Sequence, residues 1–197
     1  AFIKKRGEEK AAGNSLFSWL ACFTALGFGF MFVEVCLIQK FILFLGNPIY
    51  SASLVIFSLL VSAGMGSRFS MRFHGRSFRQ LRVLLLFLPG LLVLAAFLYP
   101  LTLSFFQGNS AVARWVFAFI LISTQGFFMG MPFPLAVRLV GSMEPRWVSW
   151  GWCANGCASV LGAILPVLVA LNWGFQTVFF LAALCYLFGF LVICKYE

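Results

Sequence analysis

Long apolar runs separated by short polar stretches dominate the pattern of this 197-residue chain. The hydrocarbon core of a bilayer needs about 20 mostly apolar residues per crossing helix, so each run is long enough to span it. The runs are continuous rather than alternating in polarity, which argues against a transmembrane β-barrel. The pattern therefore predicts an all-α membrane protein with six transmembrane helices, at about 15–39, 49–67, 81–105, 112–138, 147–171 and 175–194.

Composition strengthens this assignment and limits the domain organisation. Hydrophobic residues make up 62% of the chain and charged residues 10%, against about 25% charged in a typical soluble domain. Residues 15–194 are predicted to form one transmembrane domain, with no room for a sizeable soluble one. Residues 1–14 are predicted to be a cytoplasmic linker or an amphipathic lead-in.

The positions of lysine and arginine predict the orientation, because basic residues concentrate in cytoplasmic loops. With a cytoplasmic N-terminus, six spans leave twelve of the 14 basic residues inside and two, Lys40 and Arg114, outside. We therefore expect both termini in the cytoplasm. The inside residues are Lys4, Lys5, Arg6, Lys10, Arg68, Arg72, Arg76, Arg79, Arg82, Arg138, Arg146 and Lys195.

The loop after the second span is rich in arginine, and the net charge of the chain is +9. Each basic residue near an anionic membrane surface contributes on the order of 1 kcal/mol to binding. We interpret this loop as a site for anionic lipid headgroups on the cytoplasmic side, and we expect no nucleic acid partner because no nucleic-acid-binding fold is recognisable. The headgroup candidates are Arg68, Arg72, Arg76, Arg79 and Arg82.

Polar side chains at membrane depth are candidates for function. Glu34 lies within "GFMFVEVCLIQKF" (29–41), which also contains Gln39, and Gln125 and Asn155 lie within later spans. Two interpretations stay open for Glu34. It could accept hydrogen bonds from the Gln125 and Asn155 amides and fasten three helices, since such bonds average about 0.6 kcal/mol in membranes; or it could form a proton- or cation-coupled site. Lys40 is expected to extend outward to the interface.

Small residues and prolines predict where helices pack closely or bend. Gly126 and Gly130 form a GxxxG pattern, and Ala154, Ala158 and Gly162 form a second small-residue series; both allow close backbone contact. Pro132 and Pro134 lie within one span and predict a kink or break. Broken helices occur at transporter binding sites, but proline is also common in ordinary membrane helices.

The six cysteines lie within apolar spans. Cys153 and Cys157 share a helix face, but no histidine or carboxylate is near them in sequence, so we interpret the cysteines as packing residues. The single histidine, His74, excludes a haem held by two histidines of this chain. No metal site and no cofactor are predicted.

Three segments, "GFGFMFVEVCLIQKFILFLGNPIYSASLVIFSLLVSAGMGS" (27–67), "GFFMGMPFPLAVRL" (126–139) and "WGWCANGCASVLGAILPVLVALNWGF" (150–175), resemble the membrane domain of bacterial fused spermidine-synthase-like proteins. That resemblance implies a six-helix half of a major-facilitator-like fold in the bacterial inner membrane. The positions that it marks as characteristic are Glu34, Gln39, Gly46, Pro48, Gly66, Ser67, Pro132, Pro134, Asn155, Gly156, Ser159 and Gly162.

The chain lacks the nucleotide-binding glycine loop and acidic active-site residues of those synthases, so any aminopropyltransferase-like activity would lie in a soluble domain outside it. Three hypotheses follow. The chain is a membrane anchoring or assembly subunit, not catalytic by itself; or half of a transporter for a polyamine or other small molecule; or an enzyme acting on a lipid or polyamine. Since half a facilitator lacks an opposing wall, we expect another membrane protein or a second copy as partner.

Overall fold

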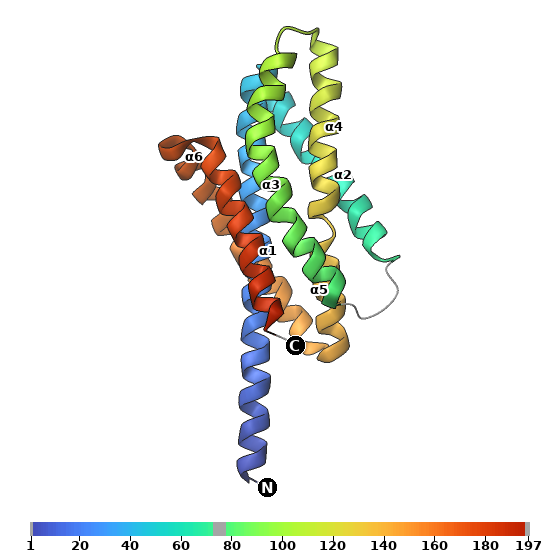
Figure 1. Ribbon diagram of the computed structural model, residues 1–197, viewed down its shortest axis with the longest axis vertical. Coiled ribbons are helices and arrows are strands. Elements are labelled where there is room, and N and C mark those ends of the chain that lie inside the picture. The colour runs from blue at the N-terminus through green and yellow to red at the C-terminus, as the bar shows by residue number, and fades with distance from the viewer. Residues whose placement is uncertain (1, 73–77, 196–197) are drawn as a thin grey trace.

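All the secondary structure in the described part of the chain is helical, as the apolar pattern predicted. The computed structural model describes residues 2–72 and 78–195, and the side chains of the first helix from Ser15 onward. Figure 1 shows one elongated bundle, beyond which the start of α1 extends. The helices are α1 (Phe2–Leu45), α2 (Pro48–Ser70), α3 (Phe78–Phe106), α4 (Ala111–Met129), α5 (Pro132–Met143) and α6 (Arg146–Cys194).

The predicted count of six membrane spans is wrong. Over the ranges that the structure describes, five helical segments are long and apolar enough to cross a membrane. The difference lies in α6, a 49-residue helix that contains both of the last two predicted spans. These five segments are Ser15–Leu45, Pro48–Ser70, Phe78–Phe106, Ala111–Met143 and Arg146–Cys194.

Helix α6 nevertheless consists of two arms. Gly174 has φ 82° and ψ 167°, a conformation that glycine adopts at no steric cost because it has no Cβ. The chain reverses direction at this residue (Figure 1). We call residues 146–173 the first arm of α6 and residues 175–194 the second arm.

The turn between α1 and α2 follows from its local sequence. Gly46 has φ 81°, the left-handed conformation that commonly terminates a helix. Asn47 then caps α2: its side-chain oxygen accepts hydrogen bonds from the backbone N–H groups of Ile49 (3.1 Å) and Tyr50 (3.3 Å). Pro48 occupies the first turn of α2, where its missing N–H costs nothing.

The predicted span 112–138 is divided into two helices. Helix α4 ends at Met129 and α5 begins at Pro132. Proline is favoured in the first turn of a helix and disfavoured in its interior, so the pair of prolines explains why one helix stops here and another starts.

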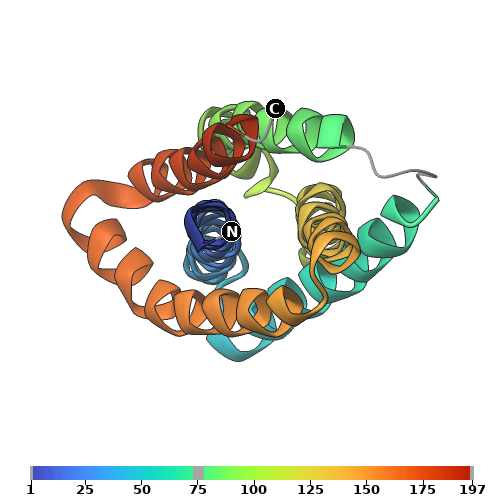
Figure 2. The same cartoon turned by 90° about the horizontal axis from the view of Figure 1, so that it is seen from below.

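Helix α1 lies inside the bundle. It packs mainly against α6, while α2 packs mainly against α4, and α3 against α6. Viewed along the bundle, the two arms of α6 pass on opposite sides of α1 (Figure 2). Large side chains of α1 fill the resulting core, among them Trp19, Phe23, Leu37 and Phe41, all of which are fully buried.

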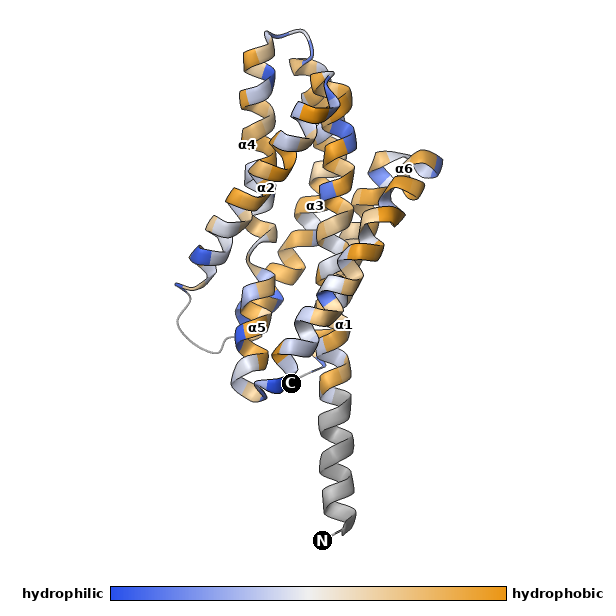
Figure 3. Cartoon of the chain, turned by 180° about the vertical axis from the view of Figure 1, so that it is seen from behind, coloured by the Kyte–Doolittle hydropathy of each residue, from blue (hydrophilic) through white to orange (hydrophobic). Residues whose placement is uncertain are grey.

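Hydrophobic residues predominate along the helices, and hydrophilic ones gather mostly at the ends of the bundle and in the connections (Figure 3). The outward-facing side chains of α2, α3 and α6 include many exposed large hydrophobic ones, which is the surface expected of helices in lipid. The start of α1 and the end of α6 lie toward the same end of the molecule (Figure 1). That this end is cytoplasmic stays a prediction.

Candidate functional site

Glu34 lies on the face of α1 that packs against the first arm of α6. Gly27 approaches Asn155 and Ala158 on this arm, and Met31 lies against Gly162. Glu34 is seven residues after Gly27, which places it on the same helix face. It is half-buried and makes no hydrogen bond or ion pair within the described residues.

The structure does not bring Glu34 together with the two amides predicted to bind it. The Asn155 side-chain amide donates instead to the backbone oxygen of Phe23 (3.1 Å). Gln125 is buried, and its side-chain oxygen accepts a hydrogen bond from the Tyr99 hydroxyl. The predicted fastener among three helices is therefore wrong in its partners, because Asn155 joins α6 to α1 and Gln125 joins α4 to α3.

The fourth member of the predicted polar set, Gln39, is half-buried on α1 and makes no hydrogen bond within the described chain. The amide nitrogen of Gln125 is also buried without a partner there. The four predicted polar residues thus belong to separate environments and do not form one cluster.

The small residues bring α2 and α4 close together. A Cβ atom at Gly66 would overlap the backbone of Phe127, and one at Gly130 would overlap the backbone of Ala63. One at Gly126 would meet the Ser62 hydroxyl. Such contacts let the helices pack backbone to backbone, which is a main source of attraction between helices in lipid.

A cavity of about 400 Å³ lies where α4 gives way to α5. Its wall is mostly apolar, with Asn155 and Ser159 of α6 as its polar side chains. Gly27 and Phe30 of α1 also line it, and Glu34 lies one turn beyond Phe30 on the same helix. The remaining lining residues are Leu26, Leu60, Met129, Gly130, Phe133, Trp152 and Tyr186.

Lys40 does not extend to the interface as predicted. The residue is only 8% exposed, and its ammonium nitrogen lies 5.8 Å from the ring centres of both Tyr99 and Phe179. The prediction assumed that a lysine near the end of a span is free to reach outward. In the structure α3 and the second arm of α6 extend as far as Lys40 and enclose it.

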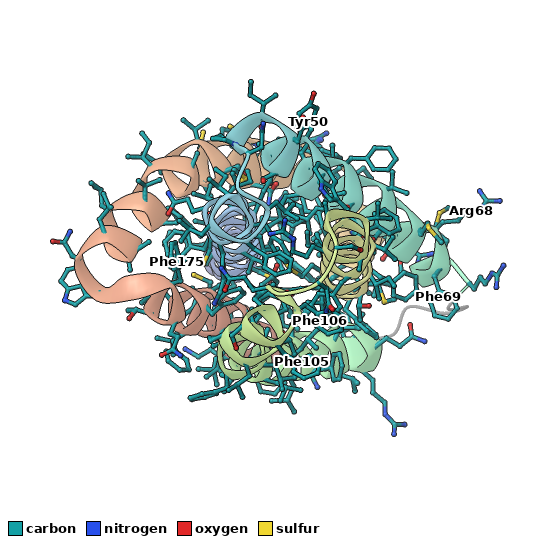
Figure 4. The ribbon with its side chains drawn as sticks, turned by 90° about the horizontal axis from the view of Figure 1, so that it is seen from above. Tyr50, Arg68, Phe69, Phe105, Phe106 and Phe175 are labelled. Carbon is teal, nitrogen blue, oxygen red and sulfur yellow. The ribbon has the colours of Figure 1, made fainter. Side chains whose placement is uncertain are left out.

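The arginines have two different environments. Arg68, Arg72 and Arg79 are exposed near the α2–α3 connection, and Figure 4 shows Arg68 at the edge of the bundle. Arg82 is half-buried and donates to the backbone oxygen of Ile193 at 3.5 Å. Arg76 lies outside the described residues, and headgroup binding by this group stays a prediction.

Arg138 and Arg114 also donate to the last turns of other helices. Arg138 donates to the backbone oxygen of Ser70 (2.8 Å) and Arg114 to that of Phe44 (3.0 Å). The last carbonyl groups of a helix lack partners within the helix and carry partial negative charge, so an arginine from a neighbouring helix satisfies them. No local pattern in the sequence indicates these contacts, because each joins residues about 70 positions apart.

The cysteines are not all buried. Cys22 and Cys36 are in the core, whereas Cys153 and Cys157 are exposed on the first arm of α6. Packing within this chain therefore does not explain the second pair. Within residues 15–72 and 78–195, whose side chains the structure describes, no three histidine, cysteine or acidic side chains form a group that could hold a metal ion.

Comparison of the chain with known protein families, with curated proteins and with solved structures finds no match.

Proposed function

We propose that the chain is an integral membrane module that anchors or assembles other proteins in the bilayer and is not catalytic by itself. The observation that carries this proposal is an open strip of small residues on the outer face of the first arm of α6. We call it the α6 strip and define it as Cys153, Gly156, Cys157 and Val160, which are all exposed.

The α6 strip contrasts with the small residues inside the bundle. Gly66, Gly126 and Gly130 each lie against another helix, but a Cβ atom at Gly156 would meet nothing within 4 Å. Small residues on a membrane helix allow another helix to approach closely. We infer that a transmembrane helix of a partner protein packs on this strip.

The resemblance of residues 27–67, 126–139 and 150–175 supports a further proposal, that the chain is the membrane domain of a spermidine-synthase-like protein in the bacterial inner membrane. Its soluble partner would then be a synthase-like domain. The all-helical apolar bundle and the helix break at Pro132 are compatible with that relation.

Cross-linking in native membranes tests the assembly function, because Cys153 and Cys157 provide two thiols beside the strip. A short reagent with a thiol-reactive group at one end and a photoreactive group at the other should join the chain to a partner, and Gly156→Leu should reduce the cross-linked fraction at least five-fold. Gly90→Leu is the matched control, since a Cβ atom at Gly90 would also meet nothing within 4 Å but Gly90 lies on α3. The Cys153→Ser/Cys157→Ser variant should give no product.

Gentle solubilisation followed by native mass spectrometry gives the deciding outcome. A complex that dissociates in Gly156→Leu and persists in Gly90→Leu supports the proposal. A chain that runs as a lone monomer in mild detergent, with no cross-linked product in membranes, contradicts it.

The cavity beside the α4–α5 break favours a second candidate, half of a transporter for a polyamine or other small molecule coupled to protons or cations through Glu34. Binding sites at interrupted helices are common in transporters, and Glu34 lies one turn from the cavity wall.

Uptake of labelled spermidine into proteoliposomes tests this second function. Glu34→Gln should lower uptake at least ten-fold, whereas Glu144→Gln, at the connection to α6, should not. Absence of uptake by the unmodified protein contradicts this function, and unchanged uptake in Glu34→Gln removes the role of Glu34.

A further inference from the structure

The cavity beside Lys40 lies at the opposite end of the bundle from the start of α1, and it takes no part in the proposed function. It has a volume of about 240 Å³ and is bounded by α1, α3 and the start of the second arm of α6. Figure 4 looks onto this end and labels Phe175, one of the residues that line the cavity. The lining residues are Lys40, Leu43, Phe44, Pro100, Leu103, Ser104, Gln107 and Phe175.

Lys40 is the charged group of this cavity. More than nine-tenths of the residue is buried, and it makes no hydrogen bond or ion pair with the described residues. The rings of Tyr99 and Phe179 attract the ammonium group, but they accept none of its three N–H bonds. The ammonium group lies at the cavity wall and has no acceptor among the described residues, so an anion that enters the cavity can pair with it.

None of the described groups at the cavity is hydrogen-bonded to the ammonium nitrogen. The backbone oxygen of Phe175 accepts a weak hydrogen bond from the Cys36 thiol at 3.5 Å. The Ser104 hydroxyl donates to the backbone oxygen of Leu101 at 2.9 Å. Arg114, the other basic residue at this end, donates one N–H to the backbone oxygen of Phe44, and it is not among the residues that line the cavity.

We propose that the Lys40 cavity binds a monocarboxylate with a short apolar body or tail. One ammonium group balances one negative charge, whereas a dianion such as phosphate would retain uncompensated charge in an apolar site. The Gln107 amide lies at the cavity and can donate a second hydrogen bond to the carboxylate. Leu43, Leu103 and Phe175 provide the apolar wall for the rest of the ligand.

Calorimetric titration of the purified chain in neutral phosphatidylcholine nanodiscs tests the proposal. Hexanoate should bind, and hexanamide, which has the same shape without the charge, should bind at least ten-fold more weakly. Lys40→Met should lower the affinity for hexanoate at least ten-fold. Lys195→Met removes the same charge from an exposed position and should leave the affinity unchanged.

Two further measurements complete the test. Oleate placed in the nanodisc should displace hexanoate if the natural carboxylate comes from the bilayer, and should leave it bound if the ligand comes from water. Ser104→Leu narrows the cavity while retaining Lys40 and should also reduce binding, which guards against misfolding of Lys40→Met. The proposal is overturned if hexanoate does not bind, if Lys40→Met binds it as well as the unmodified chain, or if inorganic phosphate binds more tightly.

Discussion

Two interfaces of the bundle hold helices together in different ways. The glycine interface joins α2 to α4, where Gly66, Gly126 and Gly130 bring backbones into contact. The aromatic interface joins α1, α3 and the second arm of α6. Here the ring centre of Tyr99 lies 6.3 Å from that of Phe41 and 5.6 Å from that of Phe179.

The difference between them lies in what each interface can enclose. The glycine interface has no space for a single added carbon at Gly66, because the backbone of Phe127 occupies it. The aromatic interface keeps its helices apart by the width of the rings. It therefore encloses polar groups, the Tyr99–Gln125 hydrogen bond and Lys40, and borders a cavity. In lipid, apolar burial does not by itself drive helices together, so close contact and ring packing are alternative sources of attraction.

Of the changes that test these two interfaces, removal of a buried ring should lower the free energy of unfolding most. Phe41 is fully buried between Phe44 and Tyr99, so Phe41→Ala leaves a void. Large-to-small changes of this kind cost about 3–5 kcal/mol in soluble cores. We expect about 3 kcal/mol here, since lipid rather than water surrounds a separated helix. Unfolding by a denaturing detergent in mixed micelles measures the loss.

Phe105→Ala is the control, because Phe105 is 80% exposed on α3. It should change the free energy of unfolding by less than about 0.5 kcal/mol. Equal losses in the two variants would show that the ring of Phe41 has no special role in joining the three helices.

The glycine interface should respond to an added methyl group. Gly66→Ala forces α2 and α4 apart at the Phe127 backbone, and overpacking of this kind costs about 1–3 kcal/mol. Gly64→Ala, two residues away on the same helix, meets nothing within 4 Å. It should be neutral or stabilising by up to about 1 kcal/mol, since alanine favours the helix over glycine. The same unfolding measurement compares them, and a neutral Gly66→Ala would mean that the helices are not in backbone contact.

The sequence predicts close packing at the glycine interface because its signals are local. The spacing of Gly126 and Gly130 predicts close packing, and Pro132 marks a helix start wherever the neighbouring helices lie. Gly174 gives another local signal. The spans predicted at 147–171 and 175–194 place a turn between them, and the chain does turn at Gly174. The count of spans differs because the two arms on either side of this turn form one of the five long apolar helices.

The sequence does not predict the aromatic interface, because its contacts join residues that are distant along the chain. The position of Lys40 depends on how far α3 and α6 extend beside α1, and residues 99 and 179 are distant from it in sequence. Each residue of the polar set was recognised as polar and within a span. Its partner could not be predicted, since Tyr99, which binds Gln125, looks like any other aromatic residue in an apolar run.

The hydrogen bond that joins Tyr99 of the aromatic interface to Gln125 of α4 should contribute least to the free energy of unfolding. Tyr99→Phe keeps the ring and removes the hydroxyl that Gln125 accepts from. Hydrogen bonds between membrane helices average about 0.6 kcal/mol, so this variant should lose roughly that amount in the mixed-micelle measurement. A loss near 3 kcal/mol would mean that the hydrogen bond rather than the ring joins α3 to α4.

A double-mutant cycle separates the bond from the cost of the buried amide. The amide nitrogen of Gln125 has no partner among the described residues, so Gln125→Leu removes one unsatisfied group together with one satisfied group and should be close to neutral. Once the amide is absent, Tyr99→Phe should have no further effect, and the coupling between the two changes should be about 0.6 kcal/mol. A cycle with no coupling would show that Tyr99 acts through its ring alone. The aromatic interface would then differ from the glycine interface only in the volume of its side chains.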